Sequence, residues 1–334
     1  MKAAILIPST SVLELKEIER PALGNRDVII KLLAGSINHH ELWSLEEKSL
    51  KSESNIIMGS DGAGIIQEVG GEVLTLKPGD EVVINPSIYW GNNNRVQGDR
   101  YEILGFPTNG TFSEQIVIDQ EYVFKKPEHL SFKEAAALPL AGLTAYRALF
   151  TRGELEVGNK VLITGIGGGA ALFALLFAKA TGASVYVTSS DENKLITAIK
   201  LGSEGGVNYK SSNWSKQLKD MAGGFDVIID SAAGPGFAEL CELANPGARI
   251  SLFGRTAGKI SNLNPSTIFW KQLSIHGTSM GTRIEFKKML DLVSKHRIKP
   301  IIDSVFPAKD INEAFNKMKS GKQFGKIVID MQRF

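Results

Sequence analysis

The stretch Asn159-Lys-Val-Leu-Ile-Thr-Gly-Ile-Gly-Gly-Gly-Ala170 joins a short apolar strand to a glycine-rich turn and the start of a helix. Its small residues follow the spacing G-x-G-x-x-[GA]: Gly165, Gly167, Gly168, Gly169 and Ala170. The first glycine turns the chain tightly, the second lets a pyrophosphate approach bare backbone, and the alanine lets the helix pack close to the strand. The helix N-terminus offers unpaired N–H groups and a partial positive charge to phosphates.

The sequence on both sides of this turn supports a nucleotide-binding role. Residues 171–180 are apolar nearly all round, as expected of a helix packed on a sheet, and Gly182 stands at a helix C-cap position. Residues 184–188 predict a second strand, rich in β-branched side chains. Because the turn stands in this strand–turn–helix–strand context, the chain is predicted to bind a dinucleotide through the five small residues.

The composition fits a two-domain enzyme. With 334 residues, the chain is long enough for two domains with substantial cores. The 38 basic and 36 acidic residues leave a net charge of +2, which implies neither a nucleic-acid nor a membrane partner. Cys241 is the only cysteine, which excludes a disulfide within the chain and a cysteine-rich metal site. No signal peptide is evident and no apolar run approaches the roughly 20 residues of a membrane span, so we expect a cytoplasmic protein.

The strand pattern changes along the chain. The first 124 residues hold short alternating segments that predict an all-β unit of barrel character: 2–7, 28–33, 64–69, 81–84 and 111–117. Ser131 and Glu134 predict a capping box, and residues 144–151 predict a further helix. From there strands alternate with helices, and six strands predict a doubly wound sheet: 160–164, 184–188, 206–208, 225–230, 248–253 and 273–278. After an amphipathic helix at 283–296, periodicity leaves open which domain the strand–helix–strand tail joins.

Landmarks outside the turn resemble those of the medium-chain dehydrogenase/reductase superfamily. They occur in order along the whole chain: Gly59-Ser-Asp-Gly-Ala-Gly64, Glu68-Val-Gly-Gly71, Lys77-Pro-Gly-Asp-Glu-Val82, Asn109-Gly-Thr-Phe-Ser-Glu114, Ala136-Ala-Leu-Pro-Leu-Ala-Gly-Leu-Thr-Ala145 and Gly325-Lys-Ile-Val328. Within the superfamily the chain is most similar to the zinc-lacking, quinone oxidoreductase-like members. The resemblance implies an α/β fold with a Rossmann domain, a doubly wound parallel sheet, inserted in a GroES-like β-barrel catalytic domain. It implies a catalytic domain at 1–124, an NAD(P)-binding domain at 125–296 and a return to the catalytic domain at 297–334.

The chain departs from zinc-dependent relatives at the metal ligands. Those relatives carry a cysteine after the third strand and Gly-His-Glu at the next motif, where this chain has Asn38 and Ser60-Asp61. Their second catalytic cysteine falls near residues 139–141 and their four-cysteine loop on residues 87–108, and neither segment contains a cysteine. Because zinc needs a tetrahedral set of such ligands, we expect no metal ion.

Two histidines leave an alternative open. His39 and His40, together with Asp61, are residue types that bind iron or zinc. Neighbouring residues on an extended strand face opposite ways, so His39 and His40 do not easily serve one metal site. We therefore expect one imidazole to line the active site and the other to form a hydrogen bond at the domain surface.

The end of the second nucleotide-domain strand indicates which dinucleotide binds. NAD enzymes of this design carry Asp or Glu there for the ribose hydroxyls, and the corresponding residue here is Ser189. Small hydroxyls can donate to a 2′-phosphate, and Lys194 adds positive charge one turn into the next helix, so NADPH is favoured over NADH. Asp191 is the competing ribose acid if the strand runs longer. The expected cofactor residues outside the turn are Ser189, Ser190, Lys194, Tyr209, Gly254 and Lys326.

Hydride transfer needs a group that polarises the acceptor oxygen. The resemblance places Asn38 and Thr144 near the nicotinamide as hydrogen-bond donors, and His39, His40 or water then supplies a proton. Without zinc, a quinone or an α,β-unsaturated carbonyl is the easier acceptor, because conjugation spreads the charge. The alternatives are a metal-free aldehyde or ketone reductase and a non-catalytic NADPH-binding protein. Residues 38–44 contain no tyrosine, which disfavours the 2-enoyl-thioester reductases that use one there.

The last predicted strand of the doubly wound sheet, residues 273–278, is expected to lie at the sheet edge. An exposed edge of unpaired N–H and C=O groups invites another strand, and a two-fold axis satisfies both copies at once. The segment has no proline and no Lys, Arg, Asp or Glu to block this pairing, and related enzymes dimerise through it. The chain is therefore predicted to form a homodimer.

Overall fold

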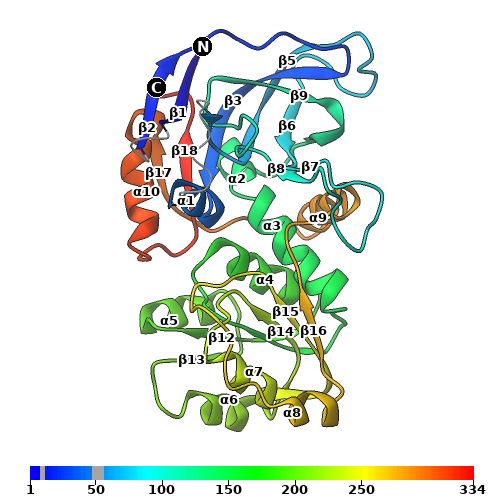
Figure 1. Ribbon diagram of the computed structural model, residues 1–334, viewed down its shortest axis with the longest axis vertical. Coiled ribbons are helices and arrows are strands. Elements are labelled where there is room, and N and C mark those ends of the chain that lie inside the picture. Colours follow the sequence, from blue (N-terminus) through cyan, green and yellow to red (C-terminus); the bar gives the residue numbers. More distant parts are fainter. Residues whose placement is uncertain (8–11, 47–55) are drawn as a thin grey trace. The chain divides into compact units, whose positions relative to one another are not determined.

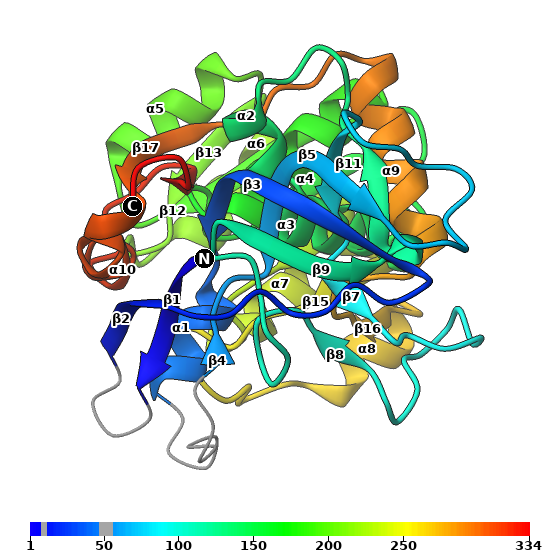
Figure 2. The same ribbon diagram turned by 90° about the horizontal axis from the view of Figure 1, so that it is seen from above.

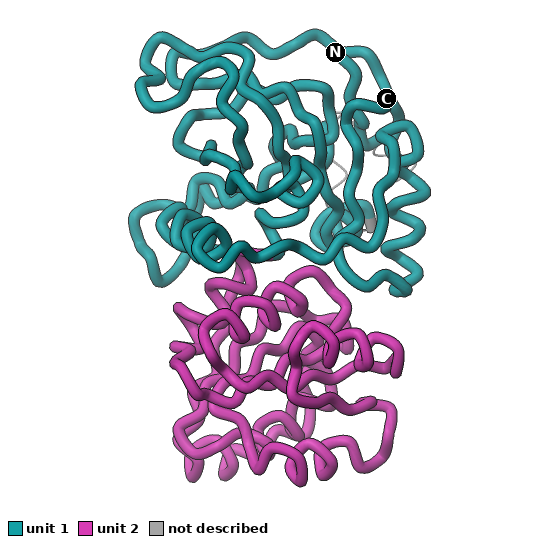
Figure 3. Tube along the Cα trace, turned by 180° about the vertical axis from the view of Figure 1, so that it is seen from behind, with its two compact units in different colours: residues 1–141, 281–334 teal, residues 142–280 magenta. Residues whose placement is uncertain are grey.

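The computed structural model describes residues 1–7, 12–46 and 56–334, which divide into two compact units. The first unit comprises residues 1–141 and 281–334, and the second comprises residues 142–280 (Figure 3). The second unit is therefore an insertion in the first. Among the described residues no helix is long and apolar enough to cross a membrane.

The first unit is organised around the long strand β3. Its strands are β1 (Lys2–Ile7), β2 (Val12–Glu17), β3 (Asp27–Ile37), β4 (Ile56–Ile57), β5 (Asp61–Val69), β6 (Glu81–Ile84), β7 (Ser87–Ile88), β8 (Glu102–Ile103), β9 (Gln115–Asp119), β10 (Val123–Lys125), β17 (Ile302–Pro307) and β18 (Lys326–Asp330). The main sheet has the order β10-β6-β5-β3-β18-β17, and β9 also pairs with β3. β5 and β9 run antiparallel beside β3 (Figure 2). β9 pairs with residues 27–31 of β3, and β18 pairs with residues 34–37. The C-terminal strand thus lies against β3, which resolves the position of the tail.

Local patterning located some of these strands better than others. β1 and β6 have the predicted bounds. The strand expected at 111–117 begins only at Gln115, because the chain just before it pairs elsewhere. Thr111 N donates to Gly59 O at 2.9 Å, and Phe112 N donates to Met58 O at 2.8 Å. Alternation alone does not reveal that a segment is bound by a distant loop.

The helices of the first unit are α1 (His39–Glu46), α2 (Phe132–Ala136), α3 (Pro139–Tyr146, which continues into the second unit), α9 (Arg283–Lys295) and α10 (Ile311–Lys319). The capping box of α2 is confirmed, since Ser131 Oγ accepts from Glu134 N and Glu134 Oε2 accepts from Ser131 N. α2 contacts β3, β5 and β18, and α9 packs Phe286 against Phe124 with ring centroids 4.9 Å apart. These contacts assign residues 125–141 and 281–296 to the first unit, whereas the sequence analysis assigned both segments to the Rossmann domain.

The second unit is a six-stranded parallel sheet covered by helices. Its strands are β11 (Lys160–Ile163), β12 (Ser184–Ser189), β13 (Gly205–Asn208), β14 (Phe225–Asp230), β15 (Ala244–Leu252) and β16 (Ser274–Gly277). Its other helices are a π-helical turn (Arg147–Arg152), α4 (Gly169–Ala180), α5 (Glu192–Lys200), α6 (Trp214–Ala222), α7 (Phe237–Leu243) and α8 (Pro265–Trp270). The strand order β13-β12-β11-β14-β15-β16 confirms the doubly wound sheet. α4 lies on one side of this sheet and α6 and α7 lie on the other (Figure 1).

The edge position of the sixth strand is as predicted, because β16 pairs only with β15 among the described strands. Ile275 on this strand is 37% exposed, and Trp270, at the end of the preceding helix, is 79% exposed. An open edge beside exposed apolar side chains suits pairing with a second copy.

The unmodified protein is expected to have a dimer mass in light scattering at micromolar concentration. Ile275→Pro is expected to give a monomer, because proline removes a backbone N–H from the edge strand. Ile275→Val keeps that N–H and serves as the control that remains dimeric. A monomer mass for the unmodified protein would contradict the prediction.

Candidate functional site

The turn between β3 and α1 places Asn38 immediately after a buried strand. α1 begins at His39, so residues 38–44 are not extended, and the argument that His39 and His40 alternate across a strand is wrong. Glu41, which is 1% exposed, accepts hydrogen bonds from Asn38 N at 2.8 Å and from Ser60 N at 2.9 Å. A glutamate three residues after the helix N-cap can reach back in this way, which explains why the strand gives way to a helix here. Glu41 therefore ties the backbones of residues 38 and 60 together.

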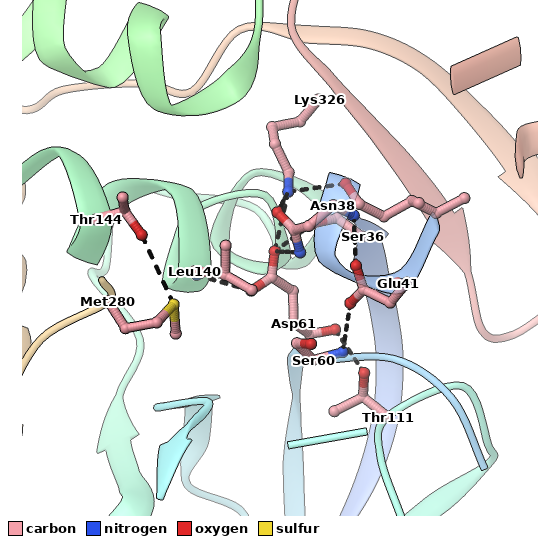
Figure 4. Close-up of polar contacts among 11 residues, drawn as sticks. Ser36, Asn38, Glu41, Ser60, Asp61, Thr111, Leu140, Thr144, Met280 and Lys326 are labelled. Carbon is pink, nitrogen blue, oxygen red and sulfur yellow. Dashed lines mark hydrogen bonds and ion pairs between the residues drawn. The ribbon is translucent and has the colours of Figure 1, made fainter. Parts of the chain in front are cut away.

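Asp61, the first residue of β5, is the acceptor at the centre of a buried network (Figure 4). Its Oδ2 accepts from Ser36 Oγ at 2.7 Å, Asn38 Nδ2 at 2.9 Å and Lys326 Nζ at 3.0 Å. Its Oδ1 accepts from Leu140 N at 2.8 Å. Three of the four donors therefore converge on Oδ2, and Oδ1 accepts one.

Lys326, the first residue of β18, brings a cation to this network. Its Nζ donates to Ile37 O at 3.0 Å, to Asp61 Oδ2, and to Asn38 Oδ1 in a short hydrogen bond. Its side chain is 4% exposed. The structure thus unites Asn38 with Lys326, two residues that the sequence analysis assigned to different roles. Whether Lys326 also contacts a cofactor stays a prediction.

Near this network, two buried polar atoms have no hydrogen-bond partner among the described residues: Ser60 Oγ and His40 Nε2. Ser60 is fully buried, and a buried hydroxyl without a partner is costly unless a ligand or water satisfies it. Burial lowers the pKa of His39, and the positive charge of Lys326 lowers it further, so both favour the neutral imidazole. The ring of His39 lies 6.2 Å from that of Trp43.

The residues at the family's metal-ligand positions do not fit zinc. Asn38 uses its amide oxygen on Lys326 and its amide nitrogen on Asp61, and both oxygens of Asp61 already accept hydrogen bonds. The ammonium group of Lys326 would also repel a divalent cation at this place. Among residues 1–7, 12–46 and 56–334, no three His, Cys, Asp or Glu side chains are arranged to hold a metal ion.

The glycine turn of the second unit has the geometry that its spacing predicts. Gly168 is the N-cap of α4, and Gly167 has a φ of 130°, which favours glycine. A Cβ at position 167 would lie 3.0 Å from Lys194 Cδ, so the Lys194 side chain passes over the turn. The structure therefore brings the predicted phosphate-binding lysine to the predicted phosphate-binding turn.

The strand β12 ends at Ser189, one residue later than predicted, and Asp191 lies outside it. Asp191 is the N-cap of α5, and its Oδ1 accepts from Asn193 N at 2.8 Å. Ser189 Oγ accepts from Asp191 N at 3.1 Å, and Tyr209 N donates to Ser189 O at 3.0 Å. Ser189 and Tyr209 are thus neighbours, while Asp191 is engaged in starting a helix.

Other residues at the carboxyl edge of this sheet form contacts that the sequence analysis did not identify. Thr164 Oγ1 donates to Asp230 Oδ1 at 2.6 Å, and burial raises the pKa of Asp230. A Cβ at Gly254 would lie 2.1 Å from Ser231 O, which explains the glycine.

Thr144, in α3, donates from Oγ1 to Met280 Sδ at 3.6 Å (Figure 4). Its expected role beside the nicotinamide stays a prediction.

Glu41, Ser60 and Asp61 are the candidate site residues whose contacts only the structure revealed. The signal for Ser60 and Asp61 is their place at the family's ligand positions, and that for Glu41 is its spacing of three from Asn38. Ser190 and Gly165 lie in the expected turns of the second unit, but their contacts with a cofactor are untested.

Two family models match this chain. The alcohol dehydrogenase GroES-like domain matches residues 24–128, and the zinc-binding dehydrogenase model matches residues 169–295. The zinc-type alcohol dehydrogenase-like protein YogA of Leptosphaeria maculans is 34% identical, over 96% of this chain and 94% of that protein. The acryloyl-coenzyme A reductase of Sulfurisphaera tokodaii is 26% identical, over 98% of this chain and 99% of that protein.

The solved structures give the same result. A crystal structure of an NAD-dependent alcohol dehydrogenase superposes with a TM-score of 0.92 and 32% identity, covering 99% of each chain. A similarity that spans both units, in sequence and in structure, covers the barrel, the inserted doubly wound sheet and the returning tail. The chain therefore belongs to the medium-chain dehydrogenase/reductase superfamily.

Proposed function

We propose that this protein is an NADPH-dependent oxidoreductase that transfers hydride, without zinc, to a quinone or an α,β-unsaturated carbonyl. The coarser assignment, an oxidoreductase, agrees with the names of its full-length relatives. The observation that carries the finer proposal is the network of Asn38, Asp61 and Lys326, which fills the family's metal-ligand positions with hydrogen bonds.

In this proposal the second unit binds the dinucleotide, and NADPH supplies the hydride when bound. The backbone of the glycine turn and the N-terminus of α4 bind the pyrophosphate. Ser189, Ser190 and Lys194 bind the 2′-phosphate, with Tyr209 beside them. The capping of α5 by Asp191 supports Ser189 over Asp191 as the residue at the ribose.

The first unit supplies hydrogen-bond donors for the acceptor oxygen. Among the contacts of the described residues, Asn38 Nδ2 donates only to Asp61, so its second hydrogen is available. The Ser60 hydroxyl, which has no hydrogen-bond partner in the part of the chain that the structure describes, is a second donor. Conjugation spreads the negative charge that develops on the acceptor, whereas a simple carbonyl concentrates that charge on its oxygen. Neutral hydrogen-bond donors are sufficient for the spread charge, which favours a conjugated acceptor. Burial and the positive charge of Lys326 lower the pKa of His39, which disfavours His39 as the source of the final proton and leaves His40 or water.

The second candidate is reduction of an aldehyde or ketone, which the names of alcohol dehydrogenase relatives favour. A non-catalytic NADPH-binding protein is the third. The experiment that separates them measures NADPH oxidation with quinones, enones and aldehydes in parallel. Turnover with quinones or enones at least about tenfold faster than with aldehydes supports the proposal, and Asn38→Ala is expected to lower kcat by about 10²-fold. Preferential reduction of aldehydes supports the second candidate, and the absence of turnover in all arms supports the third.

Protein purified without an affinity tag is expected to contain no stoichiometric zinc. Elemental analysis of protein incubated with zinc and then dialysed provides the measurement, and a zinc-containing alcohol dehydrogenase treated identically is the control. About one retained zinc ion per chain would contradict the proposal and would restore His39, His40 and Asp61 as ligands.

A further inference from the structure

Lys326 is buried in a way that fully satisfies a charged ammonium group. An ammonium has three N–H donors, and Lys326 Nζ has three acceptors: Ile37 O, Asn38 Oδ1 and Asp61 Oδ2. The whole residue is 3% exposed, and its counterion Asp61 is fully buried. The sequence motif Gly325-Lys-Ile-Val328 does not explain why a cation should be placed here.

The three oxygens around Nζ make up a cation-binding cage. Hard cations prefer oxygen ligands, and a main-chain carbonyl, an amide oxygen and a carboxylate oxygen are all of this kind. Two of the three belong to residues 38 and 61, positions at which zinc-dependent relatives carry Cys and Glu. The chain therefore keeps a cation between these positions but supplies it from its own last strand.

We propose that Lys326 is the built-in cation of the active site, a positioning residue that holds and polarises the Asn38 amide in place of a bound metal ion. This inference rests on the proposed function for its catalytic consequence. Asn38 Oδ1 accepts from the ammonium group, and a hydrogen bond to the oxygen of an amide strengthens donation from its nitrogen. The second Nδ2 hydrogen of Asn38 thereby becomes a stronger donor to the substrate oxygen, and Asp61 fixes the orientation of the amide.

The chain offers a matched control in Lys126, another buried lysine of the first unit. Its Nζ donates to Leu130 O at 2.6 Å and pairs with Glu81 Oε2 at 3.0 Å, and its side chain is 5% exposed. Lys126 has no contact with Asn38 or Asp61 among the described interactions. Replacing Lys126 therefore removes a buried ammonium group without touching the proposed cage.

The first experiment needs no enzyme activity. Lys326→Ala leaves the oxygen cage without its cation, so 100 mM ethylammonium is expected to raise the Tm of this variant by about 2–4 °C more than that of the unmodified protein. Tetramethylammonium, which has no N–H donor, is expected to give no such rise in the Tm of Lys326→Ala. Ethylammonium is expected to give no such rise in the Tm of Lys126→Ala. An equal rise in the Tm of the unmodified protein or of Lys126→Ala would refute the proposed cation cage.

The second experiment measures catalysis in the near-isosteric variant Lys326→Met, which is also the fallback if Lys326→Ala does not fold. Loss of the polarising charge is expected to lower kcat by about 10²-fold while the Kd of NADPH changes by less than about threefold. Lys326→Arg is expected to regain part of kcat, and Lys126→Met is expected to retain all of it. A weaker NADPH complex with unchanged kcat would overturn the proposal and would make Lys326 a cofactor-binding residue.

The two experiments fail separately. If the unmodified protein reduces none of the acceptors, the proposed function is refuted while the thermal shift still decides whether Lys326 occupies a cation cage. If the protein is active but Lys326→Met keeps its kcat, the proposed function stands and the role of Lys326 is refuted.

Discussion

Asp61→Asn is expected to lower the free energy of unfolding of the first unit by about 3–5 kcal/mol, because it leaves the buried ammonium group of Lys326 without a counterion. The asparagine also replaces one carboxylate oxygen by an NH2 group. At least one of the donors Ser36, Asn38 and Leu140 then loses its acceptor. Urea unfolding, monitored by fluorescence, measures the change.

A double-mutant cycle isolates the ion pair from the other contacts. The double variant Asp61→Asn with Lys326→Met is expected to lose less stability than the sum of the single variants, by about 0.5–3 kcal/mol. Asp291→Asn is the control, because Lys287 and Asp291 form a pair at 2.8 Å whose side chains are both more than 60% exposed. That pair is worth about 0.5 kcal/mol or less. Equal effects of Asp61→Asn and Asp291→Asn would refute a stabilising role for the buried network.

Ser189→Asp is expected to weaken NADPH binding by about 10²-fold and to spare or improve NADH binding. The introduced carboxylate would stand at the strand end that receives the ribose, where it would repel a 2′-phosphate by several kcal/mol but accept hydrogen bonds from free hydroxyls. Tenfold in Kd corresponds to about 1.4 kcal/mol. Isothermal titration calorimetry of the protein with each dinucleotide measures both affinities.

Two further variants separate charge from shape at this position. Ser189→Ala removes the hydroxyl without adding charge and is expected to weaken NADPH binding by no more than about fivefold to tenfold. Lys194→Met removes positive charge next to the glycine turn, so it should weaken NADPH binding more than NADH binding. If the unmodified protein binds NADH as tightly as NADPH, Asp191 is the ribose acid in spite of its capping role, and the cofactor preference is wrong.

The sequence by itself determined the features that depend on neighbouring residues. The stretch from Asn159 to Ala170 combines a strand, small residues and a helix start within twelve positions, so the second unit could be predicted from one segment. The capping box of Ser131 and Glu134 is local in the same way. The bounds of β14 also match the prediction, because apolar patterning is a property of consecutive residues.

The candidate site could be predicted only in part. Asn38 and Asp61 were identified because they stand where relatives carry metal ligands, and Ser189 and Lys194 because they follow the second strand. The start of α1 was missed because the sequence analysis treated His39 and His40 as part of an extended strand, although the spacing of Glu41 from Asn38 is a local signal for a helix start. The borders of the units were misplaced because only packing decides which sheet α2 and α9 cover.

Only the tertiary structure decided that Lys326 belongs with Asn38 and Asp61. Lys326 is 288 residues from Asn38 and 265 residues from Asp61, and the pairing of β18 with β3 brings them together. A sequence motif records which residues stand beside each other in the chain, so it assigned Lys326 to the cofactor by its local pattern. Strand pairing across the whole chain instead buries its charge among three oxygens, because a desolvated ammonium group is stable only where acceptors complete its hydrogen bonds.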